Sequence, residues 1–290
     1  EHGYCPSGLV EESVARTLEF AWADSAIANL AEALGHREDA RVFRQHSRFY
    51  RNLWNPATQY FQPRDAKGRF LEPFKPLLLT YLDRGGQITK DYVEGSALQW
   101  RWGAPHDAEG MISLFKSRES FVEELNDFFA KSSPAMGAWQ PGPYYWHGNQ
   151  PDIHAAYLFN DAGRPDLAQK WVRWIVENKY GDGDDGLDGN DDGGTLSAWF
   201  VFSALGLYPV AGTDTYQLGT PLFEKAEVRL KGGPLVIVAE NHSASIHEVQ
   251  TVRLNNTNLN RTWIKHADIE RGGVLTFEMR RCISSGQSTK

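Results

Sequence analysis

The sequence predicts a mainly α-helical fold, a partial (α/α)6 toroid, followed by a C-terminal antiparallel β segment. Up to about residue 207, apolar residues recur at helical spacing, and long loops join the helices in pairs. From about residue 213, β-branched segments alternate with turns of glycine, asparagine and proline. We therefore expect a helical portion over residues 1–212 and a β-strand region over residues 213–290. The predicted strands cover residues 215–220, 225–230, 234–241, 247–256 and 274–280.

The first two helices are expected over residues 10–35 and about 38–53. Ser13 is a suitable N-cap residue for the first helix, and Gly35 is a suitable stop signal. The apolar residues that reveal this helix by their spacing are Phe20, Ile27, Leu30 and Leu34. The residues expected on the inner side of the second helix are Val42, Phe43, His46, Phe49, Tyr50 and Leu53.

Two long irregular segments, residues 55–76 and 132–152, interrupt the helical pattern and are rich in proline and aromatic residues. Loops of this length inside a compact domain are usually functional. The remaining helices are expected over residues 91–102, 107–116, 117–129, 153–162 and 165–179.

The stretch from Gly181 to Pro209 is the most unusual part of the chain. Residues 181–192 form a loop with four glycines and six aspartates, and residues 196–207 are almost wholly apolar. A helix that is apolar on all sides is expected to be buried on all sides. The positive end of its dipole would favour ionised carboxylates in the loop before it. Such carboxylates can act as general bases or bind a hard cation, although a solvated turn has the same composition.

Composition excludes several classes of partner. The net charge of −7 argues against nucleic acid or an anionic membrane, and no apolar run is long enough to span a bilayer. Ten tryptophans suit both a large core and stacking against sugar rings. The two cysteines, Cys5 and Cys282, form neither a disulfide framework nor a zinc site, and their pairing stays open. Possible glycosylation sequons occur at Asn241, Asn255 and Asn260 and suggest secretion.

Three polar segments carry possible chemistry. Glu94 in YVEGSALQW lies among aromatic residues, where a carboxyl group can serve as a general acid. The loop WHGNQPD offers amide oxygens from Asn149 and Gln150, and Trp146 and His147 could face a sugar. The third segment is the acidic loop before the apolar helix.

In order and spacing, these segments resemble the calcium-dependent exo-α-mannosidases of glycoside hydrolase family 92. The resemblance rests on YVEG, GNQPD and GNDDGGTLSAW and continues through SVARTLEFAWAD, NLWNPATQYFQPRD, YLFNDAG and YQLGTPLF. It covers nearly the whole chain.

The resemblance implies a role for each matching residue. Glu94 corresponds to the general acid of the family. Asp192 corresponds to the base that activates water, with Asp191 or Asn190 assisting. The family's Ca²⁺ lies between the two polar loops and binds mannose hydroxyls, which implicates Asn149, Gln150 and Asp191 as ligands. Trp146, His147 and Asn190 are the expected substrate-binding residues.

Two departures from the family pattern matter. Gln150 replaces the usual glutamate of its motif, so the site loses a negative charge and should bind Ca²⁺ more weakly. About eight helices are predicted, whereas a full toroid has twelve. The resemblance therefore implies a C-terminal portion of an enzyme, partnered by an N-terminal portion that contains a β-sandwich.

The sequence leads to an exo-acting, inverting α-mannosidase as the principal hypothesis. The expected substrates are terminal α-mannosides, by family habit α-1,2-linked, in N-glycans or mannans. The expected location is secreted, periplasmic or at the cell surface. The alternative, suggested by Gln150 and the missing N-terminal portion, is a calcium-dependent mannose-binding module without turnover.

Overall fold

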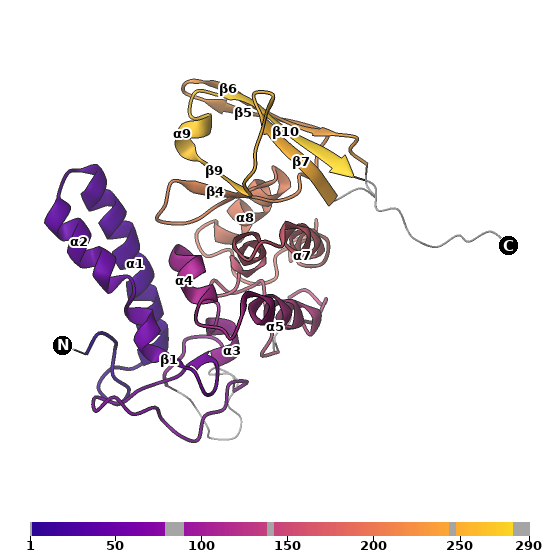
Figure 1. The fold of residues 1–290 in the computed structure, drawn as a ribbon. Coiled ribbons are helices and arrows are strands. Elements are labelled where there is room, and N and C mark those ends of the chain that lie inside the picture. Colours follow the sequence, from indigo (N-terminus) through magenta and orange to yellow (C-terminus); the bar gives the residue numbers. More distant parts are fainter. Residues whose placement is uncertain (1, 79–89, 138–141, 244–247, 281–290) are drawn as a thin grey trace.

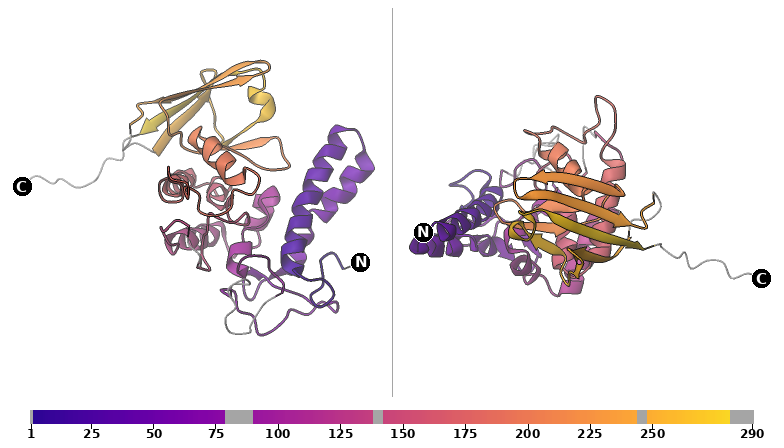
Figure 2. Two further views of the ribbon diagram at one scale, coloured as in Figure 1. Left: turned by 180° about the vertical axis from the view of Figure 1, so that it is seen from behind. Right: turned by 90° about the horizontal axis from the view of Figure 1, so that it is seen from above.

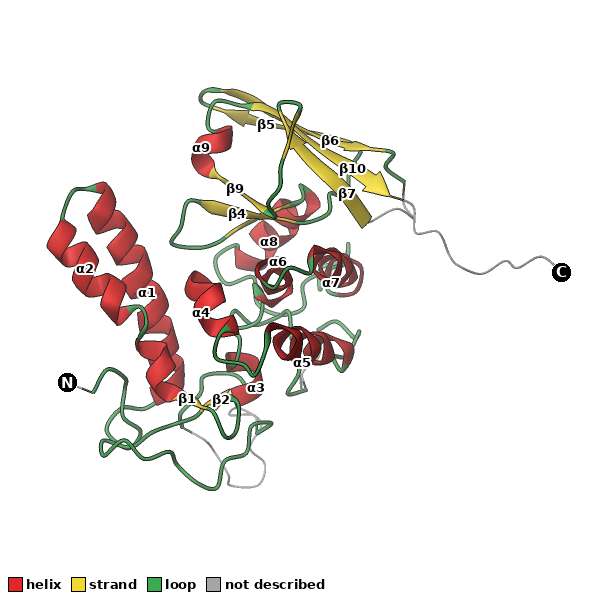
Figure 3. Ribbon diagram, viewed as in Figure 1, coloured by secondary structure: helices red, strands yellow, loops and turns green. Residues whose placement is uncertain are grey.

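The structure, a computed structural model, describes residues 2–78, 90–137, 142–243 and 248–280. Helices occupy the N-terminal two thirds, and most strands follow them (Figure 3). The main sheet lies over the helical layer, as the view from above shows (Figure 2). The order predicted from the sequence, helices and then strands, is therefore confirmed. Cys282 lies outside the described residues.

Seven α-helices lie before residue 180 in the described chain, together with three short 3₁₀ helices. The α-helices are α1 (Ser13–Ala33), α2 (Arg37–His46), α3 (Ala97–Trp100), α4 (Ala108–Ile112), α5 (Arg118–Ala130), α6 (Leu158–Asp161) and α7 (Pro165–Asn178). The 3₁₀ helices are η1 (Phe49–Leu53), η2 (Pro105–Asp107) and η3 (Ala155–Tyr157). A small hairpin, β1 (Trp54–Asn55) with β2 (Tyr60–Phe61), follows η1. The second predicted helix is thus divided into α2 and η1.

The apolar residues whose spacing predicted helix α1 are exposed to solvent. Phe20, Ile27, Leu30 and Leu34 are 53%, 42%, 61% and 64% exposed. A different face, formed mainly by small residues such as Ala21 and Ala28, is buried. Ser13 is the first helical residue, and Glu12 occupies the N-cap position without a side-chain cap. In Figure 1, α1 and α2 form a hairpin beside the other helices.

The C-terminal part contains two sheets. The five-stranded sheet has the order β5-β6-β10-β7-β8, and the three-stranded sheet has the order β3-β4-β9. Their strands are β3 (Leu207–Pro209), β4 (Thr215–Leu218), β5 (Lys225–Leu230), β6 (Gly233–Glu240), β7 (Glu248–Leu254), β8 (Thr257–Asn258), β9 (Trp263–Lys265) and β10 (Gly273–Arg280). A short helix, α9 (His266–Ile269), links β9 to the main sheet.

One strand pairing departs from the sequence prediction. Strand β10 runs parallel to β6, so the main sheet is mixed rather than antiparallel throughout. The polypeptide enters β10 after it has crossed to the smaller sheet, which allows the parallel direction. The expected boundary near residue 212 falls between β3 and β4, and these two strands pair with each other.

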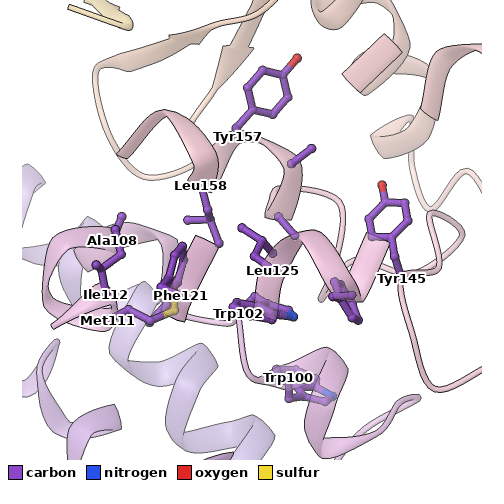
Figure 4. Close-up of a cluster of buried hydrophobic side chains, with 14 of the residues drawn as sticks. Trp100, Trp102, Ala108, Met111, Ile112, Phe121, Leu125, Tyr145, Tyr157 and Leu158 are labelled. Atoms are coloured by element: carbon purple, nitrogen blue, oxygen red, sulfur yellow. The ribbon is translucent and has the colours of Figure 1, made fainter. Parts of the chain in front are cut away.

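Helix α8 (Thr195–Ala204) connects the two hydrophobic cores. Its Trp199 belongs to the helical core, part of which Figure 4 shows around Trp102 and Phe121. Phe202 and Leu205 pack against the core of the sheets. The expectation that this helix is buried on every side is not met in the described chain, because Val201 is 56% exposed. The apolar helix ends at Ala204, where the chain turns into β3.

No helix in the described ranges is long and apolar enough to cross a bilayer.

We predict that Asp161 makes folding stability depend on pH. Burial is the main cause that raises the pKa of Asp161 to about 6, while Gln217 of β4 donates hydrogen bonds to its carboxylate oxygens at 3.2 Å. Between about pH 4 and 6 the folded chain therefore holds a proton that the unfolded chain has released. Stability should fall as pH rises through that window and stay lower at pH 7.

Asp161→Asn should consequently raise the free energy of unfolding at pH 7 by on the order of 2 kcal/mol. Urea unfolding at pH 4, 5, 6 and 7 measures this directly. Glu123→Gln, a change at an exposed position of α5, is the control and should change stability by less than about 0.5 kcal/mol. An unchanged pH profile in Asp161→Asn would contradict the assignment.

Candidate active site

Glu94 lies in a tight bend just before α3, not inside a helix as the sequence suggested. The helix begins at Ala97 because Ser96 and Gln99 form a capping box: the Ser96 hydroxyl accepts from the Gln99 amide, and Gln99 Oε1 accepts from the Ser96 amide at 2.8 Å. Glu94 has a left-handed φ of 43° and an exposed side chain. The bend projects the carboxyl group away from the helix end.

Two hydrogen bonds hold this bend. Trp100 Nε1 donates to the carbonyl oxygen of Val93 at 2.7 Å. Asn149 Nδ2 donates to the carbonyl oxygen of Glu94 at 2.6 Å. The second bond joins the GNQP loop to the YVEG segment, 55 residues earlier in the chain. The position of Glu94 therefore depends on both segments.

Glu94, Asn149 and Gln150 meet at one pocket of about 330 Å³. The pocket is lined by residues of α1, the YVEG segment and the GNQP loop: Glu12, Ala15, Arg16, Glu19, Phe20, Val93, Glu94, Trp100, Asn149, Gln150 and Pro151. A larger pocket of about 690 Å³ lies near residues 7–11 and 71–75, but none of the predicted site residues lines it. Of the predicted site residues, Glu94, Asn149 and Gln150 thus line the smaller of these two pockets.

The acidic loop reaches this pocket through Gln150. The Gln150 amide Nε2 donates to Asp192 Oδ2. Asp192 is exposed and has a left-handed φ of 47°. Asp191 lies next to it, and its Oδ1 accepts from the backbone N–H of Ser197, in the first turn of α8, at 2.9 Å. A carboxylate therefore stands at the positive end of the apolar helix, as expected from the sequence.

Close contact between two glycines brings the GNQP and acidic loops together. A Cβ atom on Gly148 would lie 2.5 Å from the carbonyl oxygen of Asp188. A Cβ atom on Gly189 would lie 2.6 Å from the carbonyl oxygen of Gly148. These distances leave no room for a side chain at either position, so the two backbones touch directly.

His147 is completely buried, and both of its ring nitrogens are hydrogen-bonded to tyrosine hydroxyls. The Tyr180 hydroxyl group donates its proton to the Leu196 carbonyl oxygen. The hydroxyl oxygen of Tyr180 therefore accepts a hydrogen bond from His147 Nε2 at 2.6 Å. His147 Nδ1 then accepts from the Tyr145 hydroxyl at 2.6 Å. Burial, followed by the charge of nearby Lys179, lowers the pKa of His147 to about 3. The buried imidazole is therefore neutral.

Direct contact between His147 and a sugar, expected from the sequence, does not fit this burial. The other two expected substrate-binding residues are placed differently. Trp146 is half-buried, and its Nε1 donates to the Asp188 carbonyl oxygen at 3.3 Å. Asn190 is exposed at the tip of the acidic loop. Both retain surface that a ligand can reach.

The three expected Ca²⁺ ligands fit a cation to different degrees. Asn149 is 5% exposed, and its Oδ1 already accepts a hydrogen bond from the backbone N–H of Gln150 at 3.1 Å. Gln150 binds Asp192 through its nitrogen, which leaves its oxygen to face a cation. Asp191 uses only Oδ1 toward α8. Hence Gln150 and Asp191 each keep an oxygen for a cation, and Asn149 Oδ1 keeps one lone pair beside its hydrogen bond.

The part of the chain that the structure describes contains no cluster of three or more His, Cys, Asp or Glu side chains able to share a metal ion. A Ca²⁺ ion at these loops would therefore need amide oxygens, water or substrate hydroxyls to complete its six to eight ligands.

Comparison with known proteins identifies the class. The description "Glycosyl hydrolase family 92 catalytic domain" matches residues 1–281. A family GH92 α-mannosidase from Bacteroides thetaiotaomicron, solved in complex with mannoimidazole, superimposes with a TM-score of 0.88 at 35% identity. The family GH92 inverting mannosidase BT2199 from the same organism gives 0.83 at 33% identity. The fold is thus that of a glycoside hydrolase catalytic domain.

The chain belongs to glycosyl hydrolase family 92. The resemblance read from the sequence is therefore confirmed. A protein of Arthroderma benhamiae, described as an uncharacterized secreted glycosidase, is 26% identical over 98% of this chain. The two bacterial structures cover 97% and 96% of the chain. In each of the three comparisons the chain spans 38% of the relative's own length.

Sequence reasoning missed several residues of the site. Arg16 and Glu19 of α1 line the pocket, although they are more than 70 residues before Glu94. Their signal was weak, since a charged residue on a helix is usually just solvated. Tyr145 and Tyr180, which bind His147, were also missed, because the sequence of an aromatic-rich chain does not indicate which tyrosine hydroxyls bind a given side chain.

We predict that Gly148→Ala and Gly189→Ala each lower the free energy of unfolding by at least about 2 kcal/mol, because a methyl group would collide with backbone atoms. Urea unfolding followed by tryptophan fluorescence gives the values. Gly142→Ala is the matched control: it lies in the same segment, and a Cβ atom there meets nothing within 4 Å. Equal stability of all three variants would rule out the glycine contact as a constraint.

Proposed function

We propose that this chain carries the catalytic centre of an exo-acting α-mannosidase that hydrolyses terminal α-mannosides with inversion. The observation that supports this most is the meeting of Glu94 with the GNQP loop in one pocket, while Gln150 in turn binds Asp192. Two neighbouring amide side chains thereby connect segments almost a hundred residues apart: Asn149 binds the backbone of Glu94, and Gln150 binds the carboxylate of Asp192.

Glu94 acts as the general acid and donates its proton to the departing glycosidic oxygen. Asp192 acts as the general base and takes a proton from a water molecule on the opposite face of the sugar, with Asp191 or Asn190 assisting. Inversion needs the two carboxyl groups about 6.5–9.5 Å apart, so that water fits between the base and the sugar. The Gln150 amide occupies one oxygen of Asp192 and orients the other.

Ca²⁺ is the proposed cofactor, held by Asn149, Gln150 and Asp191. When bound, it supplies positive charge that organises sugar hydroxyls. Asn149 keeps the ligand-bearing loop against Glu94 through its hydrogen bond.

The proposed substrates are mannose-containing glycans, with α-1,2-linked N-glycans or mannans first to be tried. The proposed location is outside the cytoplasm, which the secreted relative supports. We also propose that the chain acts with an N-terminal portion that carries a β-sandwich and completes the toroid. The exposed apolar residues Ile27 and Leu30 of α1, together with Val201 of α8, support this, since further helices would cover them.

A mannose-binding module without turnover is the second candidate. Gln150 in place of an acidic residue favours it, because an uncharged amide binds Ca²⁺ less strongly. The amide also places no negative charge next to the carboxylate of Asp192. A module would bind mannose and release no product.

Glu94→Gln should abolish cleavage of natural mannosides but spare aryl mannosides with a very good leaving group, because only a poor leaving group needs the proton. Initial rates on a mannobiose and on a dinitrophenyl mannoside make the comparison. Glu123→Gln serves as the control for removal of a carboxylate elsewhere. An equal loss on both substrates would exclude Glu94 as the acid.

Removal of divalent cations should abolish activity, and Ca²⁺ should restore it better than Zn²⁺, because the proposed ligands are oxygen atoms. With Gln150 in the site we expect millimolar rather than micromolar Ca²⁺ to be needed. Gln150→Glu should lower the concentration of Ca²⁺ that gives half-maximal activity. Full activity after exhaustive chelation would contradict the cofactor proposal.

A further inference from the structure

One face of α1 forms a wall of the pocket that contains Glu94. Arg16 and Glu19 are three residues apart and lie on the same side of the helix, and Glu12, at the N-cap position, lines the same pocket. Phe20 borders the same pocket, and its ring is largely exposed. The wall therefore offers carboxylates, a guanidinium and an aromatic face, the groups with which proteins bind sugars.

The charges on this wall are unequally matched. Arg16 forms an ion pair with Glu12 at 3.0 Å, and its Nε donates to the Glu11 carbonyl oxygen at 3.1 Å. Glu19, in contrast, has no hydrogen-bond or ion-pair partner within the described residues. Although part of its side chain is exposed, the protein atoms around its carboxyl group raise its pKa. This carboxylate is thus available to a ligand.

Structural roles for Glu19 find no support. It is the seventh residue of a 21-residue helix, which is beyond the first turn where an acidic side chain would interact with the helix dipole. Nor does it bind another helix, because no basic side chain among the described residues reaches it. A partly desolvated carboxylate without a structural partner, in the wall of a pocket that holds the proposed acid, is better explained by ligand binding.

The chemistry of the wall favours an uncharged polyol. Three carboxylates, those of Glu12, Glu19 and Glu94, face one arginine around this pocket, so an anionic ligand would be repelled. A carboxylate accepts hydrogen bonds through both oxygens, which suits neighbouring hydroxyl groups of a pyranose. The Phe20 ring adds an apolar surface for the C–H face of a sugar.

We propose that Glu19 is a substrate-binding residue, whose carboxylate accepts hydrogen bonds from hydroxyl groups of the sugar held next to Glu94. The inference rests on the proposed function and adds α1 to the parts of the chain that determine specificity. Arg16, fixed by Glu12, lines the pocket one turn away from Glu19.

The test compares Glu19→Ala, Glu19→Gln and the control Glu123→Ala in mannoside hydrolysis. A hydrogen bond to a charged group typically contributes enough that its loss lowers kcat/KM by about 10- to 100-fold. We expect such a loss for Glu19→Ala, a smaller one for Glu19→Gln, which keeps one acceptor oxygen, and none for Glu123→Ala. The thermal midpoint of each variant should stay within about 2 °C of the unaltered protein.

Monodeoxy mannosides distinguish contact from structure. For a substrate that lacks a hydroxyl bound by Glu19, Glu19→Ala should cause a smaller loss of kcat/KM than it causes for the complete mannoside. The same penalty on every deoxy substrate, or activity of Glu19→Ala within about twofold of the unaltered protein, would overturn this inference alone. Absence of turnover by the unaltered protein would overturn the proposed function and this inference with it.

Discussion

The close approach of Gly148 to the backbone at Asp188 and Gly189 is the constraint on which the site depends. It sets the GNQP loop against the acidic loop, so that Gln150 reaches Asp192. Beneath this contact, Asp188 and Lys179 form an ion pair at 3.4 Å with almost no exposed surface. Burial raises the pKa of Asp188 and lowers that of Lys179, which means that desolvation outweighs their mutual attraction. The pair therefore specifies loop geometry at a cost in stability.

Strain at the site is consistent with this view. Glu94 and Asp192, the proposed acid and base, both have positive φ angles, which cost non-glycine residues on the order of 1 kcal/mol or more each. Hydrogen bonds hold both bends: Asn149 and Trp100 bind the carbonyl groups around Glu94, and the Thr195 hydroxyl donates to the Asp192 carbonyl oxygen at 2.9 Å. Each carboxylate is thus aimed by backbone conformation, and the surrounding contacts keep that conformation in place.

Much of this could be predicted from the sequence, and the failures have physical causes. Helix spacing and β-branched segments revealed the order of elements, and the motifs singled out Glu94, Gln150 and Asp192 as candidates, whose segments the structure brings together. The burial of α1 was not predictable, because its apolar spacing marks a face that this chain leaves exposed, while its small residues pack inward. The role of His147 was missed for a related reason: its partner Tyr180 comes from a segment 33 residues away, and their meeting depends on the tertiary fold.

In the proposed reaction, Glu94 and Asp192 act together on a mannoside from opposite faces. Proton NMR of the first product, recorded during hydrolysis of an α-linked mannobiose before mutarotation, tests it most directly. An inverting reaction gives β-mannose as the initial anomer, since water attacks opposite to the departing oxygen. Initial α-mannose would contradict the account, and so would bound sugar with no product.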